Sequence, residues 1–415
     1  MTDGGQTFDV AIVGGGLAGA SLAAALRHLP LSIALIEAHA PDSAAQPSFD
    51  ERTTALGNAS RRIFEALGLW PQLAAEAAPI QSIHVSDAGR FGFARLDARE
   101  FDQEALGYVV PNRVLGRELW RVLSAAPQVT AFMPATLRDL QVQADSVQLM
   151  LDQGSAPVCA RARLVVAADG AQSAVRTAAG LSATVAEYDQ VAVVATLRTD
   201  LRNDGVAYER FTAAGPMALL PVRTPQGAAW RTLVWAARPA DAARLMALPP
   251  EQFMREWQDA FGWRAGRAMQ LGARGRYPLA LSRSSGTVAP RIVLLGNAAQ
   301  SLHPVAGQGF NLALRDVAEL AEMMACAAPQ EIGTPEWLAG FAQARTADRD
   351  GVIGFTDTLV RLFSSDHALA ATGRDAGLLL FDLLPPAKRA LSRVSLGFGA
   401  RSTRLARGLP LERGP

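Results

Sequence analysis

Apolar runs and a glycine-rich turn alternate at the start of the chain. Residues 8–13 and 32–36 are short apolar runs typical of buried strands, and the alanine- and leucine-rich segment up to about His28 has the pattern of a helix. The turn between the first strand and the helix consists of Gly14, Gly15, Gly16, Leu17, Ala18 and Gly19. The order strand, helix, strand predicts a parallel sheet and therefore an α/β fold.

The glycine spacing of this turn is that of a dinucleotide-binding βαβ unit. Gly14, Gly16 and Gly19 permit a tight turn, close approach of a pyrophosphate and close packing of the helix on the strand. Glu37 ends the second strand, where a carboxylate accepts hydrogen bonds from an adenosine ribose and disfavours a 2′-phosphate. The unit therefore predicts a site for FAD or NAD rather than NADP.

Three further polar residues follow predicted turns or strand ends. Arg52 comes after a Pro-, Ala- and Ser-rich link and is either a pyrophosphate clamp or a solvated arginine. Asn112 stands near the start of a predicted helix. Asp169, followed by Gly170, ends the buried strand 163–168 and is either a ligand contact or a helix cap.

A second glycine-rich stretch lies between a buried strand at residues 292–295 and a helix from about Phe310. Its loop is unusually long for an ordinary connection. The turn at Gly307 and Gly309 aims backbone N–H groups and the positive end of the helix at one point, which suits an electron-rich or transiently anionic group. His303, in the same loop, either fixes the loop by a hydrogen bond or shuttles a proton.

Between residues 181 and 290 the pattern changes to short strand-like runs separated by turns, with one amphipathic helix at residues 250–263. This change predicts a sheet-rich substrate domain inserted into the nucleotide-binding domain. We expect nucleotide binding by residues 1–75, 105–180 and 286–333, a substrate domain of residues 76–104 and 181–285, and a helical C-terminal region of residues 334–415.

Composition excludes several classes of protein. The 415 residues, 49% hydrophobic and 19% charged, have a globular balance, and no apolar run approaches the roughly 18 residues of a membrane span. The net charge of only +1 argues against nucleic-acid binding, and no signal peptide is readable. Cys159 and Cys326 form no metal-binding spacing, so we expect no metal and two buried free thiols in a reducing cytosol.

The C-terminal tail, residues 385–415, is strongly basic. Seven basic residues, from Lys388 to Arg413, stand against Glu412 alone, with apolar residues between them. Three interpretations stay open: a segment lying on anionic lipid, a segment docked on an acidic partner subunit, and a solvated tail.

Three separated motifs together resemble a known family. GGGLAG with Glu37, VVAADG, and LLGNAAQSLHPVAGQGFNLALRD are similar to motifs of the FAD-dependent aromatic-ring monooxygenases of the p-hydroxybenzoate hydroxylase type. Within that group, GYVVPNRVL, TDTLVRLFS and PPAKRALSR resemble the ubiquinone-biosynthesis hydroxylases. The resemblance implies a Rossmann-like FAD-binding domain, an inserted β-sheet-rich substrate domain and a helical C-terminal region.

The resemblance also implies which residues bind the cofactor. The ADP half of FAD falls to Gly14, Gly16, Leu17, Ala18, Gly19 and Glu37, and its pyrophosphate to Arg52. Asn112 falls where such enzymes have a polar side chain that contacts the flavin, and Asp169 with Gly170 falls near both the flavin pyrophosphate and the nicotinamide donor. The isoalloxazine ring would face Gly307, Gln308, Gly309 and Asn311. Asn297 stands where the family usually has Asp, so an amide replaces the carboxylate that grips the ribitol.

The implied activity is hydroxylation of a polyprenylated phenol in ubiquinone biosynthesis, with NADH or NADPH and O2, through a flavin C4a-hydroperoxide. The residues alone assign no catalytic acid or base. Two alternatives stay open: an FAD-dependent reductase or dehydrogenase acting on an isoprenoid or another aromatic, and a flavoprotein scaffold among other ubiquinone-biosynthesis proteins. We expect a cytoplasmic protein with peripheral contact at the inner face of the cytoplasmic membrane.

Overall fold

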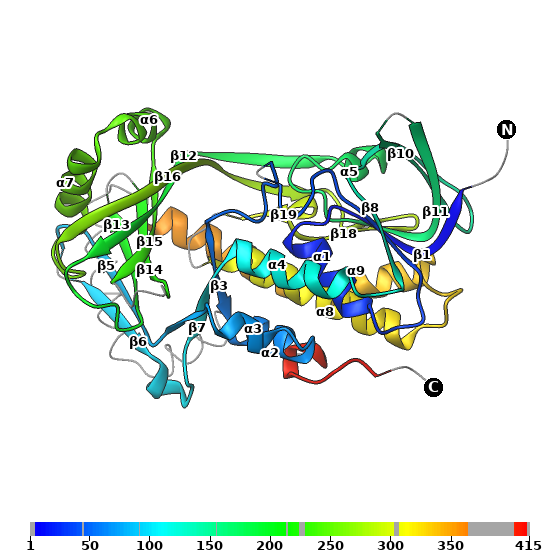
Figure 1. Ribbon diagram of the computed structural model, residues 1–415, viewed down its shortest axis with the longest axis horizontal. Coiled ribbons are helices and arrows are strands. Elements are labelled where there is room, and N and C mark those ends of the chain that lie inside the picture. Colours follow the sequence, from blue (N-terminus) through cyan, green and yellow to red (C-terminus); the bar gives the residue numbers. More distant parts are fainter. Residues whose placement is uncertain are drawn as a thin grey trace.

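The computed structural model describes residues 5–43, 45–90, 92–154, 156–212, 215–223, 229–302, 307–363 and 402–412. Two eight-stranded sheets and one three-stranded sheet carry the fold within these residues. Figure 1 shows the first large sheet at one end of the molecule and the second at the other, with long helices running between them.

The first large sheet contains the dinucleotide βαβ unit. Its parallel strands lie in the order β18 (Ile292–Leu294), β11 (Ala156–Ala167), β1 (Gln6–Val13), β2 (Ile33–Ile36) and β8 (Val129–Phe132). Antiparallel strands extend it at β17 (Val288–Ala289), β9 (Thr136–Val142) and β10 (Val147–Gln153). The parallel strands are apolar on both sides because both faces are covered.

Helices cover one face of this sheet, and their packing forms the largest apolar cluster. The helices nearest the sheet are α1 (Leu17–Leu26), α4 (Asn112–Leu123) and α8 (Gln308–Cys326), and α2 (Asn58–Ala66) and α9 (Pro335–Phe363) pack next to α8. Helix α3 (Trp70–Ala74) follows α2, and α5 (Ala174–Ala178) lies near β9. None of the helices in the described part of the chain is long and apolar enough to cross a membrane.

The second large sheet lies beyond the small one. Its order is β19 (Gln300–Ser301), β16 (Ala268–Ser284), β12 (Ala183–Thr199), β15 (Trp230–Ala237), β14 (Gly215–Pro221), β13 (Val206–Thr212), β5 (Ser82–Asp87) and β6 (Phe93–Asp97). Because it lies in the predicted substrate domain, this sheet is here called the substrate sheet. Helices α6 (Pro239–Ala247) and α7 (Pro250–Phe261) cover one of its faces. The small sheet, β3 (Thr53–Gly57), β7 (Gly107–Pro111) and β4 (Ala78–Ile80), packs against its other face.

The structure corrects several local predictions. Helix α6 was not predicted, and β12 and β16 are 17-residue strands rather than short runs, because both continue past the sheet into the connection with the nucleotide part. Helix α8 begins at Gln308 rather than near Phe310. The thiols are not buried as predicted: Cys159 is half-buried and Cys326 is exposed.

The described end of the chain is docked on the protein. Leu405, in the short 3₁₀ turn η4 (Leu405–Arg407), is 1% exposed and joins the apolar cluster that contains Phe64 of α2. The backbone N–H of Arg404 donates to the Glu322 carboxylate at 2.6 Å, and its guanidinium pairs with Glu412. Residues 402–412 are therefore not a solvated tail, and contact of the tail with lipid or with a partner subunit stays a prediction.

Helices α8 and α9 are joined by a buried group of charges. The carboxylate of Asp316 is fully buried and pairs with Arg345 at 2.7 Å and with Arg349 at 3.2 Å. Arg345 also pairs with Asp348, which accepts from Arg315 at 2.8 Å. The side chain of Gln300 in β19 donates to Asp316 at 3.3 Å, so the same carboxylate holds the substrate sheet to α8.

We predict that Asp316→Ala lowers the free energy of unfolding by about 3–5 kcal/mol, because it leaves the buried guanidinium of Arg349 without its counter-charge and leaves buried Arg345 with only one of its two carboxylate partners. The exposed pair Arg283–Asp350, at 2.7 Å, is the matched control. Asp350→Ala should change the free energy by less than about 1 kcal/mol. Urea unfolding of both variants checks the difference, and equal small losses would contradict the role of the buried pair.

Candidate cofactor site

The predicted nucleotide-binding residues lie along one edge of the first sheet. Three main-chain hydrogen bonds tie the strand ends together: Gly14 N donates to Ile36 O at 2.8 Å, Ala168 N to Val13 O at 2.7 Å, and Leu295 N to Ala167 O at 2.8 Å. Since these are the carboxyl ends of parallel strands, the residues that follow them share one edge, in the order Asn297, Asp169, Gly14–Gly19, Glu37. This edge is where open α/β sheets bind ligands.

The glycine turn leaves no room for side chains. Gly14 has a φ of 102°, which favours glycine, and a Cβ there would overlap the backbone of Ala168. A Cβ at Gly19 would overlap the carbonyl oxygen of Gly14, so α1 packs directly on the turn. A Cβ at Gly16 would lie 2.7 Å from the hydroxyl of Ser48, so the turn also contacts the link that leads to Arg52. Leu17 and Ala18 form the first residues of α1.

Glu37 is buried beside this turn. Its two carboxylate oxygens accept hydrogen bonds from the backbone N–H groups of Gly15, at 2.6 Å, and His39, at 2.9 Å. The indole N–H of Trp120 donates to the carbonyl oxygen of Gly15 at 3.2 Å, which fixes the turn from the side of α4. The carboxylate is thereby held within the turn, where it can meet the ribose of a nucleotide.

Asp169 shows one of the two predicted roles, the helix cap, and the ligand contact stays a prediction. One carboxylate oxygen accepts from Val175 N in α5 at 3.2 Å, as a helix cap does. The other is buried and has no hydrogen-bond partner among the described residues. A Cβ at the neighbouring Gly170 would meet nothing within 4 Å. The unpaired carboxylate oxygen of Asp169 could therefore accept a hydrogen bond from a hydroxyl or N–H group of a bound ligand.

Asn297 lies in the 3₁₀ turn η2 (Gly296–Ala298) and is exposed. Gly296 has a φ of 56° and packs between α1 and α8. A Cβ built on it would lie 3.2 Å from the Cβ of Ala18 in α1 and 3.7 Å from the Cβ of Ala313 in α8. This packing brings the second glycine-rich stretch next to the first. The amide of Asn297 is therefore placed at the same edge as Gly14.

The Arg52 guanidinium is engaged within the protein rather than solvated, and its contact with a pyrophosphate stays a prediction. Its guanidinium pairs with Asp50 at 2.6 Å and stacks over the ring of Tyr277 with 4.4 Å between guanidinium carbon and ring centroid. The Tyr277 hydroxyl donates to Asp50 at 3.0 Å. Because Tyr277 lies in β16, the trio joins the substrate sheet to the link beside Gly16. Asp50 and Tyr277 carried no sequence signal that singled them out.

The start of α8 is held by the side-chain amide of Asn311. Its oxygen accepts from Gly57 N at 2.9 Å and from the Ser60 hydroxyl at 2.6 Å, and its nitrogen donates to Ala55 O at 2.8 Å and Gly307 O at 2.7 Å. The amide thereby fastens β3 and α2 to the N-cap of α8. Its contact with a ring stays a prediction.

Asn112, Gln308 and Gly309 lie around the same strand. The amide oxygen of Asn112 accepts from the Thr54 hydroxyl at 2.7 Å, so it also packs against β3. Gly307 is the N-cap of α8 in the left-handed conformation, and Gln308 and Gly309 form the first turn of the helix. A Cβ at Gly309 would meet nothing within 4 Å, so space lies beside the helix start. His303 lies outside the described residues.

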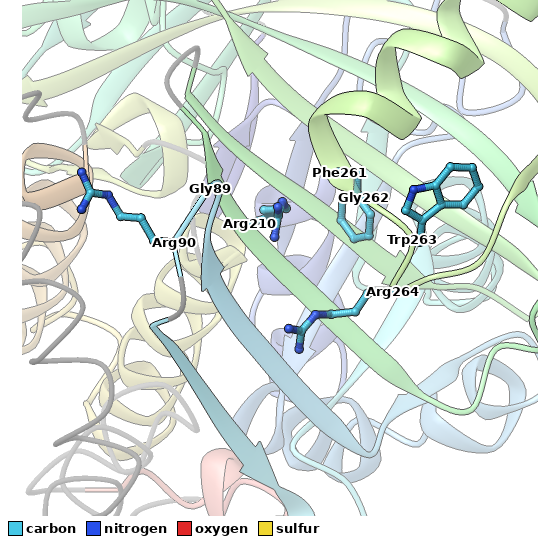
Figure 2. A pocket seen from close by; sticks show the side chains of 7 residues that line it. All are labelled: Gly89, Arg90, Arg210, Phe261, Gly262, Trp263 and Arg264. Atoms are coloured by element: carbon cyan, nitrogen blue, oxygen red, sulfur yellow. The ribbon is translucent and has the colours of Figure 1, made fainter.

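A separate cavity of about 1000 Å³ lies at the far end of the substrate sheet. Figure 2 shows that Arg210, Arg264 and Trp263 line it between α7 and the β5–β6 turn. Arg210 donates to Ala260 O of α7 at 3.2 Å and Arg264 contacts His84, so these guanidinium groups are engaged within the domain. The cavity lies on the helix-covered side of the sheet, away from the cofactor edge.

Comparisons with known proteins agree with this geometry. Residues 7–350 match the family model described as an FAD binding domain. The chain is 38% identical to ubiquinone hydroxylase UbiL of Rhodospirillum rubrum, over 98% of this chain and 94% of that protein. It is 31% identical to 3-demethoxyubiquinol 3-hydroxylase of Escherichia coli, over 94% of this chain and 99% of that protein. The crystal structure of p-nitrophenol 4-monooxygenase PnpA from Pseudomonas putida has the same fold, with a TM-score of 0.80 and 17% sequence identity. The match covers 95% of this chain and 100% of that chain.

We predict that Gly16→Val abolishes retention of the yellow dinucleotide cofactor, because a branched side chain there clashes with Ser48 and prevents a pyrophosphate from approaching the backbone of the turn closely. The matched control is Gly351→Val, since Gly351 is an exposed glycine of α9 with open space around its Cα. Visible absorbance of the purified variants, with circular dichroism to confirm folding, checks the difference. A folded Gly16→Val protein with full flavin absorbance would contradict the assignment.

Proposed function

The chain belongs to the FAD binding domain family of flavin-dependent aromatic-ring monooxygenases, and we propose that its substrate is a polyprenylated phenol of ubiquinone biosynthesis. The observation that carries the proposal is the full-length similarity to a ubiquinone hydroxylase at 38% identity. The wording of its motifs also resembles that of 2-octaprenyl-6-methoxyphenol hydroxylase. An assay panel therefore starts from 2-prenyl-6-methoxyphenols and from 3-demethoxyubiquinols.

The residues at the sheet edge fit FAD. We assign the ADP half to Gly14, Gly16, Leu17, Ala18, Gly19 and Glu37 and the ribitol to Asn297. The pyrophosphate falls to Arg52 and the start of α1, with Asp169 and Gly170 near it and near the nicotinamide donor. Bound FAD supplies the redox chemistry, taking electrons from NADH or NADPH and activating O2. The glycines would let the pyrophosphate approach the backbone of the turn closely. A donor group of bound FAD would give the buried carboxylate oxygen of Asp169 the hydrogen-bond partner that it lacks among the described residues.

The start of α8 is suited to a ring that becomes negatively charged. The helix is 19 residues long, and its first N–H groups, from Gln308 onward, have no acceptor within the helix. These groups and the helix dipole stabilise negative charge near Gly309. Asn311 holds this N-terminus at a fixed position relative to β3, so the donors do not have to reorganise during the reaction.

The substrate sheet presents an apolar surface toward this region. Val194, Ala218 and Val234 lie side by side on the face of the sheet opposite α6 and α7, and each is only partly buried by protein. Such a surface accepts an aromatic ring with an isoprenoid chain and excludes water from the reacting atoms. This feature favours a hydrophobic phenol over a charged substrate.

Oxygen-18 labelling tests the proposed activity. The holoenzyme supplied with NADH or NADPH, labelled O2 and a 2-prenyl-6-methoxyphenol should incorporate one labelled oxygen atom into the ring. A reductase or dehydrogenase would consume the donor without incorporation, and a scaffold would consume none. Neither result would be compatible with a monooxygenase acting on this substrate class.

We further propose that the basic residues before the docked chain end attract the enzyme to an anionic membrane surface, where such a substrate is dissolved. Support comes from the charge of residues 385–401, which lies outside the described residues. Each basic group near such a surface contributes about 1 kcal/mol. Truncation is not a suitable test, because Leu405 belongs to the protein core.

Charge substitution is the suitable test. The triple variant Lys388→Gln, Arg389→Gln and Arg393→Gln should lose flotation with anionic liposomes at low salt, whereas wild type floats and is released at high salt. The control removes three exposed charges elsewhere, at Arg99, Arg138 and Arg244. Equal flotation of the first triple variant and wild type would exclude the tail as the contact.

A further inference from the structure

The carboxyl group of Glu209 projects from the substrate sheet between strands β14 and β5. Glu209 lies in β13, where neighbouring side chains point to opposite faces. The ring of Tyr208 lies 5.7 Å from that of Phe261, and Arg210 donates to Ala260 O, so both point toward α7. Glu209, between them, therefore points to the face that α6 and α7 leave uncovered.

That face looks toward the cofactor part of the molecule. Ala207, two residues before Glu209 on the same face, belongs to the apolar cluster that includes Val109 of β7 and has Ala55 of β3 packed against it. Ala55 in turn lies 3.3 Å from a Cβ built on Gly307, the N-cap of α8. Two residues of a strand span about 7 Å. Glu209 therefore lies about 7 Å along β13 from Ala207, the residue through which the substrate sheet packs toward the start of α8.

The surroundings of Glu209 are apolar. Val85 and Ala218 are its direct neighbours across the ladders, and Val234 and Val194 continue the same row. Glu209 makes no hydrogen bond or ion pair with any residue in the described ranges, although its side chain is only half-buried. Burial among apolar groups, with no compensating charge, raises its pKa to about 7.

Other titratable groups on this face are engaged or distant. Asp87 in β5 pairs with Arg90 at 3.8 Å, and Tyr277 in β16 donates to Asp50. Arg198 lies on the same face of β12, four residues beyond Val194. The row that contains Glu209 holds no second ionisable side chain.

We propose that the Glu209 carboxylate is the catalytic base that takes the proton of the substrate's ring hydroxyl. The O–H bond of the phenol breaks, the proton moves to a carboxylate oxygen of Glu209, and the electron pair stays on the phenol oxygen. No electrons are exchanged in this step. The phenolate makes its ring more electron-rich and therefore more reactive toward the activated oxygen. The inference rests on the proposed function, since it requires a phenolic substrate at this face.

The chemistry of the carboxyl group suits this transfer. A phenol has a pKa of about 10 and an ordinary Glu about 4.3, so an unperturbed carboxylate is a weak base for a phenol. Because its apolar surroundings raise the pKa of Glu209, the difference in pKa between this carboxyl group and a phenol is smaller than for an ordinary Glu. The carboxyl group is still ionised above neutral pH. A carboxylate that already had an internal partner would be a weaker base, and Glu209 has none among the described residues.

The first test compares Glu209→Gln with Glu187→Gln, which removes an exposed carboxylate of β12. In Glu209→Gln, hydroxylated product should fall roughly 100-fold or more, while FAD content and flavin reduction by NAD(P)H stay within about twofold. Wild-type product formation should decline as pH falls through about 7, because the carboxyl group becomes protonated. The Gln variant should lack this step, and Glu209→Asp, which keeps a carboxylate, should retain it.

The second test does not depend on turnover. The affinity of the oxidised holoenzyme for 2-methoxyphenol, measured across pH, reports whether an ionised carboxylate accepts a hydrogen bond from the hydroxyl of the bound phenol. Wild type should bind the phenol more tightly above a pH of about 7 than below it, and Glu209→Gln should lack this step. The same step in the Gln variant, or no step in wild type, would overturn the proposal. Failure of wild type to hydroxylate any prenylphenol, with the pH-dependent binding step present, would instead count against the proposed function.

Discussion

The long antiparallel pairing of β12 with β16 fixes the distance between the two halves of the molecule. Each strand has 17 residues, and the ladder runs from Ala183–Ser284 at the nucleotide end to Thr199–Ala268 in the substrate sheet. β19 adds to the first end and leads into the stretch before α8. Because the hydrogen-bonded ladder cannot slide without reversing every side chain, the position of the substrate sheet relative to the cofactor edge is set by register.

Smaller contacts then refine what the ladder places. Tyr277, on β16, joins Arg52 and Asp50, and Gln300, on β19, joins the buried Asp316 of α8. Asn311 ties α8 to β3, and β3 belongs to the small sheet that packs under the substrate sheet. The same short series of contacts therefore positions both the apolar face of the substrate sheet and the start of α8. The groups expected to meet substrate and cofactor are thus in place before a substrate binds.

The sequence predicted the parts whose chemistry is local. Glycine spacing and the acid at the end of β2 revealed the nucleotide edge, because a turn that excludes side chains can be recognised without its neighbours. The family was identified correctly from three motifs. Tyr277, Asp50 and Glu209 were missed because their meaning arises from strands far apart in sequence. The alternation of Ala207, Glu209 and Phe211 with Tyr208 and Arg210 did carry a signal, an acid at an apolar-face position, but it becomes informative only when the covered face is known.

The cofactor edge also has a consequence for how the protein is made. It is assembled from β1, β2, β11 and β18, and the last of these strands ends at Leu294. A ribosome must therefore deliver about 70% of the chain before the dinucleotide cradle is complete, and Leu405 still has to reach α2. Such distant pairings are slow to form. Newly made chains must pass through an interval in which the first glycine turn exists without its neighbouring strand, so cofactor loading is a late event of biosynthesis.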